Sequence, residues 1–216
     1  MYFSIEGVIG VGKTTLARLL APAFQANLLL EVFEENPFLS DFYSDRARYA
    51  FQTQIFFLLS RYHQQHKAVI DLTAGGQSLI SDYTFEKDAL FASINLKGDE
   101  LQMYYKVHEA LAEKITAPEL LVYLRASTDT LMQRIAMRDR PYERAMERSY
   151  IGELNQAYDE YYLNGSHVCP VLTIETDQMD FVRNHDDLRT VENRIRQALQ
   201  LAPFQPMLPL TGKQNP

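Results

Sequence analysis

The sequence predicts an α/β fold in which a five-stranded parallel sheet is flanked by helices. One observation is a series of short apolar runs, each of a length that suits a buried strand. Another is that segments with helical spacing separate these runs, and alternating strands and helices build a parallel sheet covered on both faces. The chain length of 216 residues also suits one sizeable domain with its own core.

The candidate strands and helices alternate along the chain. The apolar runs that predict strands lie at 2–5, 28–33, 79–81, 120–124 and 171–174. The segments with helical spacing lie at 14–24, 45–72, 99–115, 149–162 and 187–199. Ser127 is suited to cap a further helix that ends near Arg138, because Pro141 cannot continue it. Asn36 followed by Pro37 predicts another helix start. We expect one domain over 1–202 and a loosely ordered, proline-containing tail over 203–216.

Composition excludes several classes of function. A net charge of −7 argues against nucleic acid as a partner, because phosphate backbones call for a basic surface. No stretch approaches the ~18 apolar residues of a membrane span. Cys169 is the only cysteine, which rules out an internal disulfide and predicts a cytoplasmic protein.

The segment "IEGVIGVGKTT" contains a complete Walker A pattern that follows one predicted strand and opens one predicted helix. Its glycines let the backbone wrap around phosphate, the lysine reaches the β- and γ-phosphates, and the first threonine can ligate Mg²⁺. The sequence therefore predicts an ATP site with Mg²⁺. The residues of this loop that we expect to bind the donor are Gly7, Gly10, Gly12, Lys13, Thr14 and Thr15.

The rest of the chain favours transfer to a small molecule over hydrolysis. A GTPase would need an Asn-Lys-x-Asp base reader, which does not occur in the sequence. A large motor or transporter would need a much longer chain. A short chain with a phosphate loop and a late arginine-rich segment is typical of a small-molecule kinase.

Acidic residues at the ends of two predicted strands are candidate catalytic groups. Glu31 interrupts an apolar run, and the carboxyl end of a strand is where open α/β sheets bind ligands. It is therefore a candidate base for an acceptor hydroxyl, or alternatively a helix cap. Asp82 ends "QSLISD" and can hold Mg²⁺ as a Walker B acid or serve as a turn cap.

The segment "QRIAMRDRPYERAMER" concentrates arginines in a net-acidic chain. Cations at a helix C-terminus and solvated ion pairs would explain such a cluster. Because the chain also contains a Walker A loop, we favour a lid whose Arg134, Arg138 and Arg140 stabilise the charge of the transferred phosphoryl group.

The helix predicted over 45–72 carries aromatic stripes. Such stripes are typical of a core or a dimer interface, but Gln52 beside Phe56 could also form part of a nucleobase pocket. His63 and His66 lack a third candidate ligand, so we do not expect a metal there.

Five motifs in order resemble the deoxynucleoside kinase family, and especially its bacterial deoxyadenosine/deoxyguanosine kinase branch. They are "IEGVIGVGKTT", "EVFEENPFL", "FYSDRARYAFQTQIFFLLSRYHQQ", "ISDYTFEKDALFA" and "YLRASTDTLMQRIAMRDRPYE". The resemblance implies the P-loop nucleoside-kinase fold with an arginine-rich lid over about 138–148. It also implies that the strand before Asp82 lies between those before Glu31 and Gly7, and that the protein is a homodimer through helices 45–72 and 99–115.

The resemblance also implies roles for single residues. Glu31 would be the base on the 5′-hydroxyl, Tyr43 and Glu143 would hold the sugar 3′-hydroxyl, and Asp82 would serve Mg²⁺. The residues implied at the nucleobase are Gln52, Asp88 and Phe91. Many relatives have an arginine after the acid at 82, where this chain has Tyr83, so either another arginine supplies that charge or the 5′-oxygen is held less firmly.

We therefore predict ATP-dependent phosphorylation of a purine deoxynucleoside, deoxyadenosine ahead of deoxyguanosine. The alternatives are a pyrimidine deoxynucleoside kinase, a thymidylate-type monophosphate kinase, and a non-catalytic subunit that retains the fold.

Overall fold

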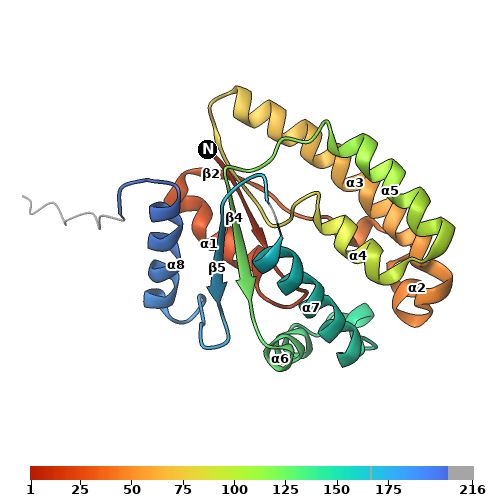
Figure 1. Cartoon of the computed structure of the whole chain (residues 1–216). Coiled ribbons are helices and arrows are strands. Elements are labelled where there is room, and N and C mark those ends of the chain that lie inside the picture. Colours follow the sequence, from red (N-terminus) through yellow and green to blue (C-terminus); the bar gives the residue numbers. More distant parts are fainter. Residues whose placement is uncertain (166, 204–216) are drawn as a thin grey trace, which may run out of the picture.

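A parallel sheet forms the centre of the molecule, which is described by a computed structural model over residues 1–165 and 167–203 (Figure 1). Its strands are β1 (Tyr2–Glu6), β2 (Ala26–Leu29), β3 (Ser78–Ser81), β4 (Leu120–Arg125) and β5 (Val171–Glu175). They are all parallel in the order β2-β3-β1-β4-β5. The predicted fold class is confirmed, and so is the place of β3 between β2 and β1.

Helices cover both faces of this sheet. Figure 1 shows α1 and α8 on one side and α3, α4, α5 and α7 on the other. The α-helices are α1 (Lys13–Phe24), α2 (Leu39–Ser44), α3 (Arg46–Ala74), α4 (Lys87–Asn95), α5 (Gly98–Ala112), α6 (Thr128–Arg138), α7 (Arg148–Asn164) and α8 (His185–Ala198). The short 3₁₀ helices are η1 (Phe33–Glu35) and η2 (Pro141–Glu143). None of the helices in the described part of the chain is long and apolar enough to cross a membrane.

Because helices pack on both faces of the sheet, the central strands are continuous apolar runs. Every residue of β1 is buried, and Phe3, Ile5 and Val122 are fully inaccessible to solvent. Because the strands are parallel, their carboxyl ends meet at one edge of the sheet. That edge carries the loop that starts at Gly7, the residue Asp82 and, beyond the end of β2, Glu31.

Two local predictions differ from the structure, and one helix was not predicted. The strand predicted over 28–33 ends at Leu29, because Glu31 N donates to the Asp82 side chain instead of the sheet (2.8 Å). Asn36 caps a turn by accepting from Phe38 N (2.9 Å), and the helix begins only at α2. Helix α4 was not predicted, since its short apolar pattern carries little periodicity. The cap predicted at Ser127 is confirmed by a hydrogen bond from Thr130 N to its Oγ (3.3 Å).

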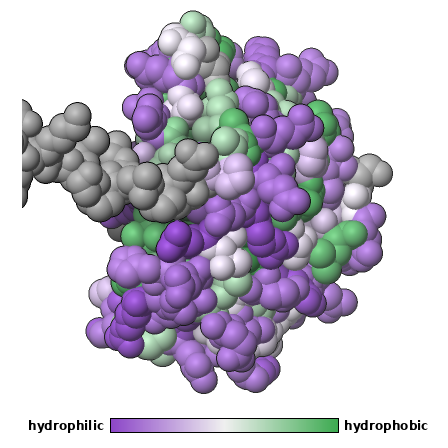
Figure 2. Space-filling model, turned by 90° about the vertical axis from the view of Figure 1, so that its left-hand side faces the viewer, coloured by the Kyte–Doolittle hydropathy of each residue, from purple (hydrophilic) through white to green (hydrophobic). Residues whose placement is uncertain are grey.

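Figure 2 shows that the face of the molecule on the α8 side is mostly hydrophilic, with small scattered apolar spots. Of the predicted loose tail, residues 204–216 lie outside the described residues.

Candidate active site

The phosphate loop joins β1 to α1 and has the backbone geometry that its glycines predict. Gly10 and Gly12 have positive φ values of +89° and +105°, which residues with a Cβ atom rarely adopt. The Lys13 ammonium donates to the carbonyl oxygens of Gly7 (2.6 Å) and Val8 (3.2 Å). Burial and the positive charge of Lys87 lower the pKa of Lys13 to about 8.

Asp82 connects the phosphate loop to the segment that carries Glu31. Its Oδ2 accepts a hydrogen bond from the Thr14 hydroxyl, and its Oδ1 accepts one from Glu31 N (2.8 Å). Asp82 is almost fully buried, so these bonds are protected from water. The parallel order β2-β3-β1 therefore fixes Glu31 next to the loop, although the two are far apart in the sequence.

The Glu31 carboxylate lies between two cations from different helices. Its Oε1 accepts from both Arg61 Nε (3.0 Å) and Arg61 Nη2, and its Oε2 accepts from Lys87 Nζ (2.5 Å). Burial alone would raise the pKa of Glu31, but the Arg61 and Lys87 charges hold that pKa well below its ordinary value. Glu31 is therefore ionised throughout the physiological pH range and can accept a hydrogen bond from a ligand.

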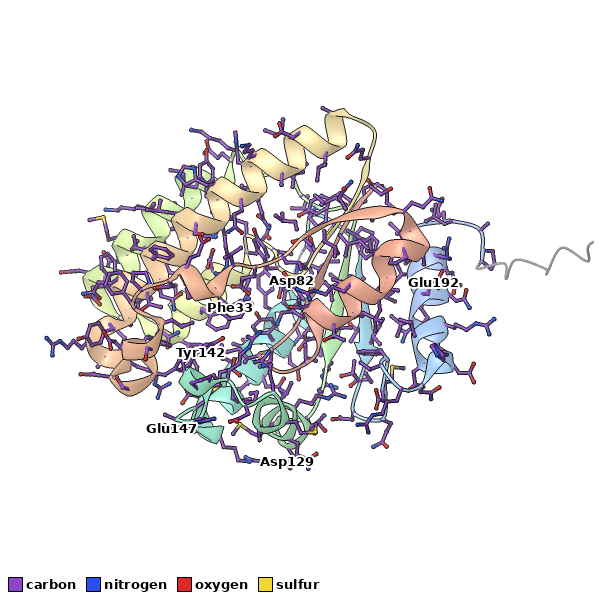
Figure 3. The ribbon with its side chains drawn as sticks, turned by 180° about the vertical axis from the view of Figure 1, so that it is seen from behind. Phe33, Asp82, Asp129, Tyr142, Glu147 and Glu192 are labelled. Carbon is purple, nitrogen blue, oxygen red and sulfur yellow. The ribbon has the colours of Figure 1, made fainter. Side chains whose placement is uncertain are left out.

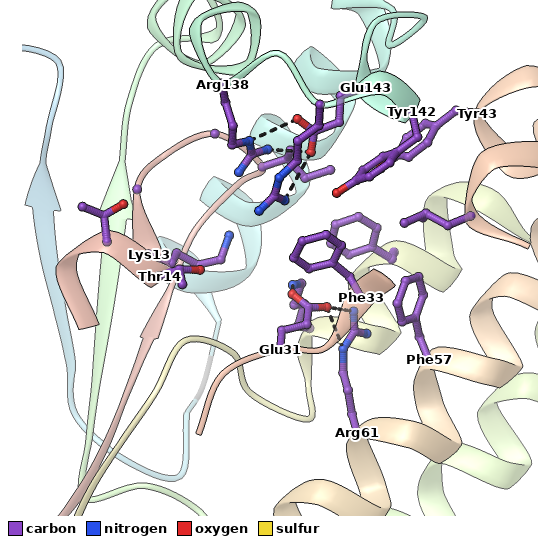
Figure 4. Close-up of a pocket in the computed structure, with 18 of the residues that line it drawn as sticks. Lys13, Thr14, Glu31, Phe33, Tyr43, Phe57, Arg61, Arg138, Tyr142 and Glu143 are labelled. Carbon is purple, nitrogen blue, oxygen red and sulfur yellow. Dashed lines mark hydrogen bonds and ion pairs between the residues drawn. The ribbon is translucent and has the colours of Figure 1, made fainter. Parts of the chain in front are cut away.

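Glu31 and Lys13 line one cavity of about 330 Å³, which is within the usual range for small-molecule sites. Figure 4 shows Lys13 and Thr14 on one side of the cavity, Arg138 and Glu143 above it, and Glu31 below. The carboxylate thus points into the space that the phosphate loop borders, and not into the apolar interior.

Aromatic rings form much of the wall. Tyr43 and Tyr142 are stacked with an interplanar angle of 13° and a centroid distance of 6.3 Å. Phe33 lies under the Arg140 guanidinium at 4.2 Å, and Phe57 lies under Arg61 at 4.6 Å. In Figure 3, Phe33 and Tyr142 lie to the left of Asp82, the residue that follows β3. A slot of this kind suits a flat ring system.

The arginines of the segment 138–148 divide into two groups. Arg138 holds the buried Glu143 through two bonds of 2.6 and 3.1 Å, Arg140 lies 3.7 Å from the same carboxylate, and all three residues line the cavity. Arg144 and Arg148 instead form exposed pairs with aspartates, which is the solvated placement that we kept as an alternative.

Arg134 does not line the cavity. Its guanidinium donates to the carbonyl oxygens of Val11 (3.2 Å), Thr176 (2.6 Å) and Met179 (3.3 Å), and to the Thr176 hydroxyl. It thereby ties the phosphate loop to the segment after β5.

Eleven of the predicted site residues line this cavity, and Gly7, Gln52, Phe56, Asp82, Asp88 and Arg134 do not. Those that line it are Gly10, Gly12, Lys13, Thr14, Thr15, Glu31, Tyr43, Phe91, Arg138, Arg140 and Glu143. Gln52 is exposed on α3, and the half-buried Phe56 does not line the cavity. Gln54 and Phe57, which lie next along α3, line the cavity instead.

Gln54 and Asp88 supply polar groups at this end of the site. Gln54 is buried, and its Oε1 accepts no hydrogen bond within the described residues. Asp88 is fully buried behind the cavity and forms an ion pair with Arg61. Arg61 therefore bridges Asp88 and Glu31, which gives this end of the site buried charges of both signs.

The sequence reasoning missed Arg61 and Lys87. An arginine seven residues after Gln54, on the same helical face and among apolar residues, is a signal that could have revealed Arg61. Lys87 gave no such signal, since its contact with Glu31 depends on the order of the strands.

The sequence and the fold are similar to those of known proteins. A family model described as "Deoxynucleoside kinase" matches residues 3–200. The chain is 34% identical to a deoxyguanosine kinase of Bacillus subtilis over 92% of its length and 97% of that relative. It is 30% identical to a deoxyadenosine/deoxycytidine kinase of the same organism, over 89% and 90% of the two chains. The fold matches a structure of deoxyadenosine kinase from M. mycoides with bound dCTP, with a TM-score of 0.79 at 24% identity and coverage of 91% and 100%.

Proposed function

The chain belongs to the deoxynucleoside kinase family, and from this premise we propose that it transfers the γ-phosphoryl group of ATP to the 5′-hydroxyl of a purine deoxynucleoside. The observation that carries the proposal is that Glu31 and Lys13 line one cavity, and that Asp82 links Glu31 N to the hydroxyl of Thr14, the residue after Lys13. A purine is favoured because both Bacillus subtilis relatives are named for a purine deoxynucleoside, deoxyguanosine in one and deoxyadenosine, beside deoxycytidine, in the other. Of the two, the resemblance to the bacterial branch favours deoxyadenosine.

The reaction that we propose needs little covalent chemistry from the protein. The 5′-oxygen forms a bond to the γ-phosphorus, the bond from that phosphorus to the β-phosphate oxygen breaks, and Glu31 takes the hydroxyl proton. Because the transition state of such transfers is loose, the proton leaves late and a weak base is sufficient. Lys13, Arg138 and Arg140 stabilise the charge that spreads over the phosphoryl oxygens.

Mg²⁺ is part of the proposal. The Thr14 hydroxyl and the Asp82 carboxylate lie in contact at the start of α1, and such oxygen donors fit this ion. Within residues 1–165 and 167–203, no group of three histidine, cysteine or acidic side chains could hold a metal. Phosphate oxygens of the donor would therefore complete the coordination. The ion, when bound, neutralises phosphate charge.

At the acceptor end we propose that Tyr43 and Glu143 hold the sugar and that Gln54 contacts the base. The amide of Gln54 can both donate and accept, as an adenine edge requires. The two cations at this end, Arg61 and Lys87, are already matched by carboxylates, as an uncharged nucleoside would require. A monophosphate acceptor would instead call for free positive charge.

A panel of four deoxynucleosides with Mg-ATP, scored by kcat/KM, tests the proposal. We expect the two purine deoxynucleosides to have the highest values and deoxynucleoside monophosphates to be poor acceptors. Phosphorylation of thymidine or deoxycytidine alone would contradict the purine assignment, and phosphorylation of none would contradict the kinase assignment.

We also propose that the protein is a homodimer through the outer faces of α3 and α5. Large apolar side chains are exposed there, among them Leu59 (42% exposed) and Met103 (53%). Light scattering coupled to gel filtration should give twice the mass of one chain, and Leu59→Glu should give the single mass. A monomeric wild type would contradict the proposal.

A further inference from the structure

Lys87, the first residue of α4, is a buried lysine that the proposed mechanism does not yet use. Its side chain is 5% exposed, and its ammonium lies 2.5 Å from Glu31 Oε2. Arg61 occupies the other carboxylate oxygen, so the two cations grip opposite ends of the same group. Lys87 also lines the cavity together with Lys13.

The fold gives Lys87 a fixed place. Glu6, at the end of β1, is fully buried, and its Oε1 accepts from Thr84 N (2.6 Å) and from the Thr84 hydroxyl (3.1 Å). Its Oε2 accepts from Gly7 N (3.1 Å). One carboxylate therefore anchors both the phosphate loop and the segment that leads into α4, so the positions of the loop and of Lys87 are set together.

Tyr83 cannot supply a charge to Glu31. Its ring is fully buried, and its hydroxyl donates to Gln64 Oε1 on α3 (2.8 Å). Position 83 does not line the cavity. A positive charge near the acceptor hydroxyl would therefore come from another residue.

We propose that Lys87 is the positioning residue for Glu31, acting through its ion pair with Oε2 to aim the carboxylate at the acceptor 5′-hydroxyl. This inference rests on the function proposed above. Each carboxylate oxygen has two lone pairs, and Lys87 and Arg61 leave a lone pair free for the hydroxyl. With both ends held, the carboxylate cannot rotate away from the phosphate loop, and correct orientation is a large part of such catalysis.

A double-mutant cycle tests this role. Lys87→Met should lower kcat ~30-fold or more in the wild-type background, with KM for the deoxynucleoside changed less than ~3-fold. In a Glu31→Gln background the same substitution should lower kcat less than ~3-fold, because no carboxylate remains to be positioned. Lys97→Met, at an exposed lysine ten residues away, should leave kcat unchanged in both backgrounds.

Lys87→Gln is a second variant with a neutral side chain, and it replaces Lys87→Met in the test where that variant folds poorly. It should show the same dependence on the background. An equal loss of kcat in both backgrounds would overturn the role of Lys87, since a purely structural effect does not depend on Glu31. A wild type without kinase activity would instead overturn the proposed function, so the two failures are distinguishable.

Discussion

The buried ion pair of Asp88 and Arg61 allows a quantitative prediction for Asp88→Asn. The aspartate is fully buried, and the substitution would leave Arg61 and Lys87 facing Glu31 alone. Removing one partner of a buried pair costs ~3–5 kcal/mol. Because Arg61 keeps Glu31, we expect the lower end, ~3 kcal/mol, which lowers the unfolding midpoint of a domain of this size by ~6–12 °C.

Thermal unfolding followed by circular dichroism measures this effect. The matched control is Asp129→Asn, which breaks another Arg–Asp pair whose Asp129 and Arg148 side chains are 75% and 63% exposed. That variant should unfold at the wild-type midpoint, since exposed pairs contribute little. Equal midpoints for the two variants would refute the reasoning that burial makes the Asp88 pair costly to break.

Three further predictions concern the cavity and the phosphate loop. Gln54→Leu should raise KM for the deoxynucleoside ~10-fold, as expected for one lost hydrogen bond. Gln52→Leu, at an exposed position, should leave KM unchanged. Equal KM values for the two variants in steady-state kinetics would contradict the placement of Gln54 at the base. Gly10→Ala would place a Cβ 2.8 Å from a side chain of α6 and should weaken ATP binding in isothermal titration. In the control Gly76→Ala the new Cβ meets no atom within 4 Å, so this variant should bind ATP as the wild type does. The pKa of Lys13 is lowered to about 8 by burial and by Lys87, so its charge is lost as pH rises through that value. ATP affinity should therefore fall up to ~10-fold between pH ~7.5 and ~9, and a constant affinity would exclude this titration.

The fold could be predicted from the sequence because the patterns that indicate its strands and its phosphate loop are local. The fully buried strands β1 and β4 are continuous apolar runs, and the Walker A loop must follow a strand and begin a helix. The position of Glu31 near that loop followed from the strand order that the resemblance implied. These features need no knowledge of side-chain packing.

The face of α3 that lines the site was not predictable in the same way. Helical periodicity shows which residues share a face, but α3 has apolar residues on several faces, and only packing decides which one meets the sheet. Which glutamine, Gln52 or Gln54, lines the cavity depends on the face of α3 that meets the sheet. The contact of Lys87 with Glu31 likewise joins two segments whose meeting is fixed by β3 lying between β2 and β1.

The central claim is that the Glu31 carboxylate activates an acceptor hydroxyl beside the phosphate loop. Its most direct test is transfer of label from γ-labelled ATP to deoxyadenosine by the wild type and by Glu31→Gln, which keeps the shape of the side chain. The account predicts labelled 5′-monophosphate from the wild type. In the variant it predicts a kcat at least ~100-fold lower, with deoxynucleoside binding retained in isothermal titration. Turnover of Glu31→Gln at the wild-type rate, or label that appears only in inorganic phosphate, would contradict the claim.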